Sequence, residues 1–83
     1  MDAQAEQVFK NLQIALESVG ADFSHVIKLT YYLVDISEIT LVREVRNRYL
    51  KAGQFPASTA MEVSRLVQPD WLIEVDAIAY LPD

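Results

Sequence analysis

An α+β fold, with two helices packed on one face of a small β-sheet, is the fold class that the sequence predicts. Two segments carry apolar residues at the helical spacing of three and four. Three other segments are rich in β-branched and aromatic residues that alternate with polar ones, as in strands. The order is helix, strand, helix, strand, strand, and placing both helices on one face of the sheet is the compact arrangement of this set.

The length and composition of the chain favour one domain and exclude several kinds of site. The 83 residues are 52% hydrophobic and 23% charged, which is a globular composition with enough apolar residues for one small core. Cysteine is absent and His25 is the only histidine, so we expect no disulfide and no metal site. The net charge of −5 argues against a nucleic-acid-binding surface, which needs clustered basic side chains. We therefore expect residues 1–83 to form a single domain.

The N-terminal sequence MDAQAEQVFKNL has neither the basic start nor the apolar run of a signal peptide. No other stretch approaches the ~20 consecutive apolar residues that a membrane-spanning helix needs. The sequence therefore predicts a cytoplasmic protein that binds neither membranes nor nucleic acids.

The first predicted helix covers residues 3–19. Its apolar stripe consists of Ala5, Val8, Phe9, Leu12, Ala15, Leu16 and Val19. Gly20 can end this helix in a left-handed C-cap, and the sequence ADFSH that follows is typical of a turn.

Residues 26–34, VIKLTYYLV, predict the first strand because β-branched and aromatic side chains fill it. Strict alternation assigns one face to Ile27, Leu29, Tyr31 and Leu33. A second helix is predicted next, with Asp35 as N-cap and Glu38 three residues later in a capping-box pattern. Its apolar stripe is Ile39, Val42, Val45, Tyr49 and Leu50. The helix should end at Gly53, because Pro56 prevents its continuation.

Residues 58–66 and 71–81 predict two further strands, separated by the turn residues of VQPD. In the last strand Ile73, Val75, Ala77 and Ala79 are small and apolar enough to lie beneath the helices. The opposite face carries Leu72, Glu74, Asp76, Ile78 and Tyr80. No remaining element can cover this second face, and exposed apolar faces of this kind mark sites of association. We therefore expect a homo-oligomer that forms through the helix-free face of the sheet.

Four stretches of the chain are AEQVFKNLQIALESVGADFSHVIKLTYYLVDISEI, VREVRNRYL, FPASTAMEVSRL and LIEVDAIA. In their order and spacing they resemble, over nearly all 83 residues, the RidA/YjgF family of imine/enamine deaminases, also described as endoribonucleases L-PSP. The resemblance implies a chorismate-mutase-like fold that assembles as a homotrimer, with clefts between subunits. It also implies that a small 2-imino or 2-enamino acid is hydrolysed there to a 2-keto acid and ammonia, without a cofactor.

The sequence departs from the family pattern in two places. Members usually begin with a β-hairpin and a further strand before the first helix, whereas this chain begins at that helix, so these strands are expected to be missing. The second departure is Ser58, which stands where the family has arginine in a Pro-Ala-Arg-Ser motif. Arginine can hold a carboxylate through two parallel hydrogen bonds, and serine offers one neutral donor. Loss of the charge-assisted pair should weaken carboxylate binding about ten- to a hundredfold.

The resemblance assigns roles to four residues, and each has a simpler alternative. Glu74 matches a family glutamate that is thought to position or activate the attacking water; it could instead pair with Arg65 or Lys28. Ser58 and Thr59 would bind polar groups of the substrate, although Ser58 could also simply begin a strand. Arg43 stands where the family often has an asparagine near the cleft, and could replace the missing arginine or lie on a solvated helix face.

Two functions therefore remain open. The first is a cofactor-free deaminase of small imino or enamino acids, with its site at a subunit interface and a small carboxylate metabolite as ligand. The second is a non-catalytic oligomer of the same fold that binds a small ligand or a partner, which Ser58 and the expected missing strands favour. A serine nucleophile is not expected, because His25 lies on a distant predicted turn.

Overall fold

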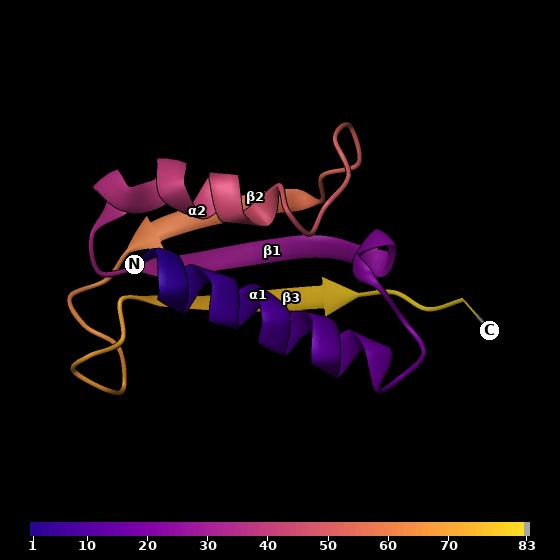
Figure 1. The fold of residues 1–83 in the computed structure, drawn as a ribbon, viewed down its shortest axis with the longest axis horizontal. Helices are drawn as coiled ribbons and strands as arrows, with labels where there is room; N and C mark the ends of the chain where they lie inside the picture. Colours follow the sequence, from indigo (N-terminus) through magenta and orange to yellow (C-terminus); the bar gives the residue numbers. More distant parts are fainter. Residues whose placement is uncertain (83) are drawn as a thin grey trace.

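The computed structural model describes residues 1–82, and its elements follow the predicted order (Figure 1). They are helix α1 (Asp2–Glu17), a 3-10 turn (Phe23–His25), strand β1 (Val26–Leu33), a second 3-10 turn (Ile36–Glu38), helix α2 (Ile39–Arg46), strand β2 (Ala57–Glu62) and strand β3 (Ile73–Ala79). The α+β class is thereby confirmed.

Strand β1 is the centre of the sheet, whose order is β2-β1-β3. It pairs with β2 in parallel, with Leu29 opposite Ser58, and with β3 in antiparallel, with Tyr32 opposite Glu74. The parallel pair is joined through α2, because parallel strands need a crossover connection. Strands β2 and β3, although consecutive in the chain, are therefore the two edges of the sheet (Figure 1).

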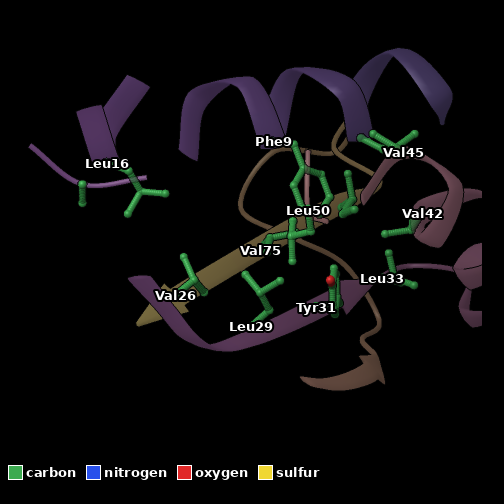
Figure 2. Packing of buried hydrophobic residues seen from close by; sticks show 13 residues of the cluster. Phe9, Leu16, Val26, Leu29, Tyr31, Leu33, Val42, Val45, Leu50 and Val75 are labelled. Atoms are coloured by element: carbon green, nitrogen blue, oxygen red, sulfur yellow. The ribbon is translucent and has the colours of Figure 1, made fainter. Parts of the chain in front are cut away.

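The core lies between one face of the sheet and the two helices (Figure 2). Its largest fully buried side chains are Phe9, Leu29, Leu33, Val42 and Val45. Phe9 is the centre of an aromatic cluster, with ring centroids 6.2 Å from Phe23, 6.4 Å from Tyr31 and 5.6 Å from Tyr49. Tilted and offset rings at such distances are the favourable geometry for aromatic pairs.

From Ile73 to Ile78 the two faces of β3 are as predicted, whereas Ala79 is exposed instead of lying beneath a helix. Ile73 and Val75 are buried among the core residues, whereas Asp76 and Ile78 are exposed on the opposite side. Neither helix lies on that side, because the core that both helices share is built on the other. Within the described residues, the sheet therefore has one covered face and one helix-free face.

The predicted facing is wrong at the start of β1. Strict alternation gave Ile27 the same facing as Leu29, but Leu29 and Val26 are buried whereas Ile27 is 56% exposed. The pairing register with β3 shifts between Val26 and Lys28. An irregularity of this kind adds one residue to the strand and reverses the facing of the residues before it. From Leu29 onward the predicted alternation holds.

Helix α1 ends at Glu17, two residues before its predicted end, and Val19 is 64% exposed rather than part of the buried stripe. The predicted C-cap at Gly20 has a φ of 77°, a left-handed conformation that costs glycine little. The amide of Ala21 donates to the carbonyl of Leu16 at 2.9 Å, which closes the helix end.

Helix α2 ends at Arg46, well before the predicted end at Gly53. The Leu50 amide still donates to the Arg46 carbonyl at 3.0 Å, so one more turn keeps the helical spacing that the sequence pattern detects. At the start, the Asp35 carboxylate accepts the Ser37 amide at 3.0 Å and the Ser37 hydroxyl at 2.7 Å. Asp35 is thus a cap, but of the 3-10 turn before α2, with Ser37 as its partner instead of Glu38.

Both outer strands are shorter than predicted, β2 ending at Glu62 and β3 at Ala79. Their partner β1 ends at Leu33, whose carbonyl accepts the Val63 amide at 2.8 Å as the last contact with the chain leaving β2. A strand can continue only while a neighbour supplies hydrogen-bonding partners, so the length of β1 limits both edges.

Candidate functional site

The four predicted site residues lie on two sides of the sheet. Ser58 is opposite Leu29 in the parallel ladder, and both residues face the helices. Arg43 is an exposed residue of α2, on that same side of the sheet. Thr59 and Glu74 have the opposite facing and belong to the helix-free face, opposite Thr30 and Tyr32 respectively. One copy of the chain therefore does not bring Ser58 and Glu74 onto a common face.

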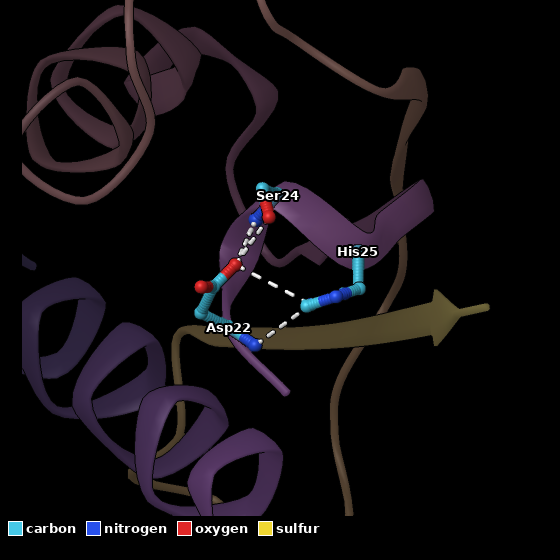
Figure 3. A network of polar contacts seen from close by, with 3 residues as sticks. All are labelled: Asp22, Ser24 and His25. Carbon is cyan, nitrogen blue, oxygen red and sulfur yellow. Dashed lines mark hydrogen bonds and ion pairs between the residues drawn. The ribbon is translucent and has the colours of Figure 1, made fainter. Parts of the chain in front are cut away.

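Within the described residues, the Ser58 hydroxyl does not contact a histidine that could activate it as a nucleophile. Its hydroxyl donates to the Pro56 carbonyl at 3.2 Å, a contact that orders the turn into β2. The only histidine lies on the 3-10 turn before β1, in a local network with Asp22 and Ser24 (Figure 3). There the Asp22 amide donates to His25 Nδ1 at 3.1 Å, and the Ser24 hydroxyl donates to the Asp22 carboxylate.

The Asp22 network caps the 3-10 turn. The hydroxyl and amide of Ser24 both donate to Asp22, which lowers the pKa of the Asp22 carboxyl. The Ser24 hydroxyl donates to the aspartate rather than to His25, so the serine–histidine hydrogen bond of a triad is not formed among the described residues. This serine, histidine and aspartate therefore stabilise the chain turn and do not form a hydrolytic triad.

On the helix-covered side, the structure brings Arg46 close to the predicted site, a residue that sequence reasoning missed. The Arg46 guanidinium lies over the Phe55 ring, 4.1 Å from its centroid. Its Nε and Nη2 atoms donate to Asn47 Oδ1 at 3.2 and 3.0 Å. Within residues 1–82 the arginine that forms ion pairs is Arg48, so Arg46 has no carboxylate partner there.

Beside Arg46 lies a buried hydroxyl without a hydrogen bond. Tyr31 is only 4% exposed, and its Oη atom has no partner among the described residues (Figure 2). Burial raises the pKa of the Tyr31 hydroxyl, and the nearby Arg46 guanidinium and Ser58 hydroxyl partly oppose that rise. An orphaned buried hydroxyl is unfavourable, so its presence in a core calls for an explanation.

On the helix-free face two acids lie close to Tyr32. Its hydroxyl donates to Asp76 Oδ2 at 3.1 Å, and this hydrogen bond is the main cause that raises the pKa of Tyr32. Glu74 is half-buried and, within the described residues, pairs with neither Lys28 nor Arg65. Its carboxylate is therefore not neutralised by a neighbouring cation of its own chain.

A groove of about 590 Å³ runs between α1 and the free edge of β3. Val8 and Leu12 line it from the helix, and Ile73, Val75 and Glu74 line it from the strand. Gln4 closes one end, because its side chain donates to the Asp70 carbonyl and accepts the Leu72 amide, both at 2.8 Å. Glu74 is thus a carboxylate at the rim of a largely apolar groove that is large enough for a small metabolite.

No cluster of three potential metal ligands is found in residues 1–82. In the same residues, neither helix has the length and hydropathy that crossing a lipid bilayer requires.

The family model described as Endoribonuclease L-PSP matches residues 1–81. The chain belongs to this family, the RidA/YjgF family. As a RidA/YjgF family member it is 43% identical over 77 residues to Protein DfrA of Myxococcus xanthus, a match that covers 93% of the chain and 57% of DfrA.

The human 2-iminobutanoate/2-iminopropanoate deaminase is 37% identical to this RidA/YjgF family member over 76 residues, which cover 92% of the chain and 54% of the human protein. The chain thus spans little more than half the length of these curated relatives. A crystal structure of a YjgF/YER057c/UK114 family member from Mycobacterium tuberculosis superimposes with a TM-score of 0.90 and 31% identity. That match covers 96% of the chain and 67% of the mycobacterial one, and it confirms the fold.

Proposed function

We propose that this RidA/YjgF family member is a subunit of a cofactor-free deaminase that hydrolyses small 2-imino or 2-enamino acids. The observation that carries the proposal is Glu74, a carboxylate without a cationic partner at the rim of the α1/β3 groove. The similarity of the chain to relatives named as 2-iminobutanoate/2-iminopropanoate deaminases suggests the substrate class. Residence in the cytoplasm is part of the same proposal.

In the proposed reaction, Glu74 acts on water. Its carboxylate accepts a proton as the water oxygen attacks the carbon of the protonated imine, which forms a C–O bond and moves the π electrons onto nitrogen. Glu74 then gives this proton to nitrogen, and as the C–N bond breaks, the hydroxyl proton of the intermediate passes back to Glu74, which leaves the 2-keto acid and ammonia. The proton that Glu74 finally releases to solvent replaces the one that had protonated the imine. The sum is imine plus water to ketone plus ammonia, without oxidation or reduction, so that general acid–base catalysis by a positioned carboxylate suffices.

The proposed site also needs groups that hold the substrate, and these are Ser58, Thr59 and Arg43. Because Ser58 and Glu74 have opposite facings within one chain, a site that contains both must be built from two copies. A homotrimer in which the edge strand β2 of one copy lies beside the edge strand β3 of the next would supply such a boundary. Self-association also fits the exposure of Ile78 and Met61, which are 55% and 40% exposed on the helix-free face.

Replacement of Glu74 tests the proposal directly. We expect the purified protein to accelerate hydrolysis of 2-iminobutanoate, and Glu74→Gln to lower kcat by about 10²- to 10⁴-fold, the usual contribution of a general base. Asp76→Asn is the matched control, because it removes a neighbouring acid of the same face that hydrogen-bonds Tyr32. Equal loss in both variants, or full activity in Glu74→Gln, would contradict the role given to Glu74.

A second function, a non-catalytic oligomer that binds a small ligand or a partner, is favoured by one observation. Ser58 stands in place of the family arginine, so the chain lacks the usual guanidinium on β2. If the native protein leaves 2-iminobutanoate hydrolysis at the uncatalysed rate and Ser58→Arg creates activity, this second function is correct and the first is wrong.

A further inference from the structure

We propose that Arg46, Tyr31 and Ser58 form a carboxylate-binding site on the helix-covered side of the sheet. In this site the guanidinium comes from helix α2 instead of from strand β2. The inference deepens the proposed function, since it names the residues that would hold the carboxylate of the substrate, and it rests on that function for the identity of the ligand.

Arg46 is held by neutral groups. Its partners are the neutral amide oxygen of Asn47 and the face of the Phe55 ring, and no acid of residues 1–82 forms an ion pair with it. A guanidinium binds an anionic carboxylate about twice as strongly as a neutral acceptor, and can do so through two parallel bonds. A carboxylate ligand can therefore displace Asn47 from Arg46.

The Tyr31 hydroxyl is a second feature of this site. It is buried and has no hydrogen-bond partner among the described residues, and a group that binds a ligand is one explanation for such a hydroxyl. It lies on the same face as Ser58, since Tyr31 is opposite Ala60 in the parallel ladder and Ser58 is two residues before Ala60, and the Arg46 guanidinium also acts on it electrostatically. Since the Tyr31 oxygen is closed off from solvent, a ligand would contact it only when neighbouring side chains move.

The charges around these residues also favour a bound anion. Arg43 lies one turn before Arg46 on α2, and it too acts electrostatically on Tyr31. The acid on β2 that shares the facing of Ser58 is Glu62, and its carboxylate accepts the Ile36 amide at 3.1 Å. The chain has a net charge of −5, but a small anion bound near Ser58 would lie close to two arginines, Arg43 and Arg46.

A structural role for Arg46 makes a different prediction. A cation in the last turn stabilises a helix through the helix dipole, and in that role Arg46 would affect stability alone. The experiment must therefore measure ligand binding and stability separately.

We would titrate the purified oligomer with 2-oxobutanoate by calorimetry, using neutral 2-butanone as the matched probe without a carboxylate. The wild type should bind 2-oxobutanoate and not 2-butanone, and Arg46→Gln should weaken binding about 10- to 100-fold. Arg65→Gln, which removes a positive charge outside the cluster, should leave binding unchanged. The double variant Arg46→Gln/Ser58→Arg should recover binding, because it returns a guanidinium to the same site from the strand.

Tyr31→Phe separates the binding role from a structural one. Removal of an orphaned buried hydroxyl should raise the melting temperature, whereas loss of a donor to the ligand should weaken 2-oxobutanoate binding several-fold. Binding by Tyr31→Phe or Arg46→Gln that equals the wild type would overturn the proposal, as would a wild type that binds both probes alike or neither.

The outcomes also distinguish this proposal from the proposed function. Hydrolysis that depends on Glu74 but proceeds with an unchanged KM in Arg46→Gln would refute the carboxylate site and leave the deaminase standing. Binding of 2-oxobutanoate that depends on Arg46, in a protein without hydrolytic activity, would confirm the carboxylate site and refute the deaminase.

Discussion

At the scale of single residues, Glu6 connects the two helical parts of the fold. Its carboxylate accepts hydrogen bonds from the Tyr49 hydroxyl and from Arg48 Nη1, the latter at 2.9 Å. Arg48 also lies 3.6 Å from Asp2, so that one guanidinium serves two acids of α1. These contacts lower the pKa of Glu6, chiefly through the Tyr49 hydrogen bond and then through Arg48.

A pH dependence of stability follows from Glu6. Its pKa is lower in the folded protein than the ordinary value of 4.5, so its contribution is present above pH 4.5 and is lost as the pH falls through the folded-state pKa. We expect Glu6→Gln to lower the urea midpoint at pH 7, and this effect to shrink as the pH falls through the folded-state pKa of Glu6, below which the wild-type carboxyl is itself protonated. Glu17→Gln on the same helix is the control. A loss for Glu6→Gln that is the same at every pH would contradict the prediction.

At the scale of elements, the regular parts of the fold could be predicted from the sequence because their signals are local. The stripes of α1 and α2 and the left-handed C-cap at Gly20 depend on residues within a few positions of one another. The irregularity after Val26 could not be predicted, because it depends on how β1 matches β3, whose paired residues lie about fifty positions later in the chain. The end of β2 could not be predicted for the same reason, since it depends on the length of the partner strand β1.

The irregularity at the start of β1 predicts unequal effects for two adjacent residues. Val26→Ala should destabilise the fold by about 1–2 kcal/mol, since it removes buried methyl groups and leaves a cavity. Ile27→Ala should cost less than about 0.5 kcal/mol, because that side chain is largely exposed. Urea unfolding at one fixed protein concentration would measure both changes. A larger loss for Ile27→Ala would show that the strict alternation is correct after all.

At the scale of the whole molecule, the sequence could predict part of the candidate site. The facing of Glu74 follows from alternation within one strand, and the structure agrees. The nearness of Arg46 to Tyr31 and Ser58 could not be predicted, because it requires the parallel pairing of β1 with β2 and the end of α2 at Arg46. A tyrosine on the inward face of a predicted strand was the one available signal, since a buried hydroxyl needs a partner.

The uncovered face of the sheet leads to the last prediction, which concerns assembly. Ile78 is 55% exposed on the helix-free face, opposite Lys28 in the antiparallel ladder. Ile78→Glu should preserve the fold, because glutamate opposite lysine is a favourable cross-strand pair, but it should place a charge in an apolar contact between copies. We expect light scattering coupled to gel filtration to show an oligomer for the wild type and a smaller species for Ile78→Glu. Ile14→Glu is the matched control, because Ile14 is 57% exposed on α1 and glutamate is compatible with a helix. A wild type that stays monomeric at high concentration, or an Ile78→Glu variant that keeps the wild-type mass, would show that this face is not the contact.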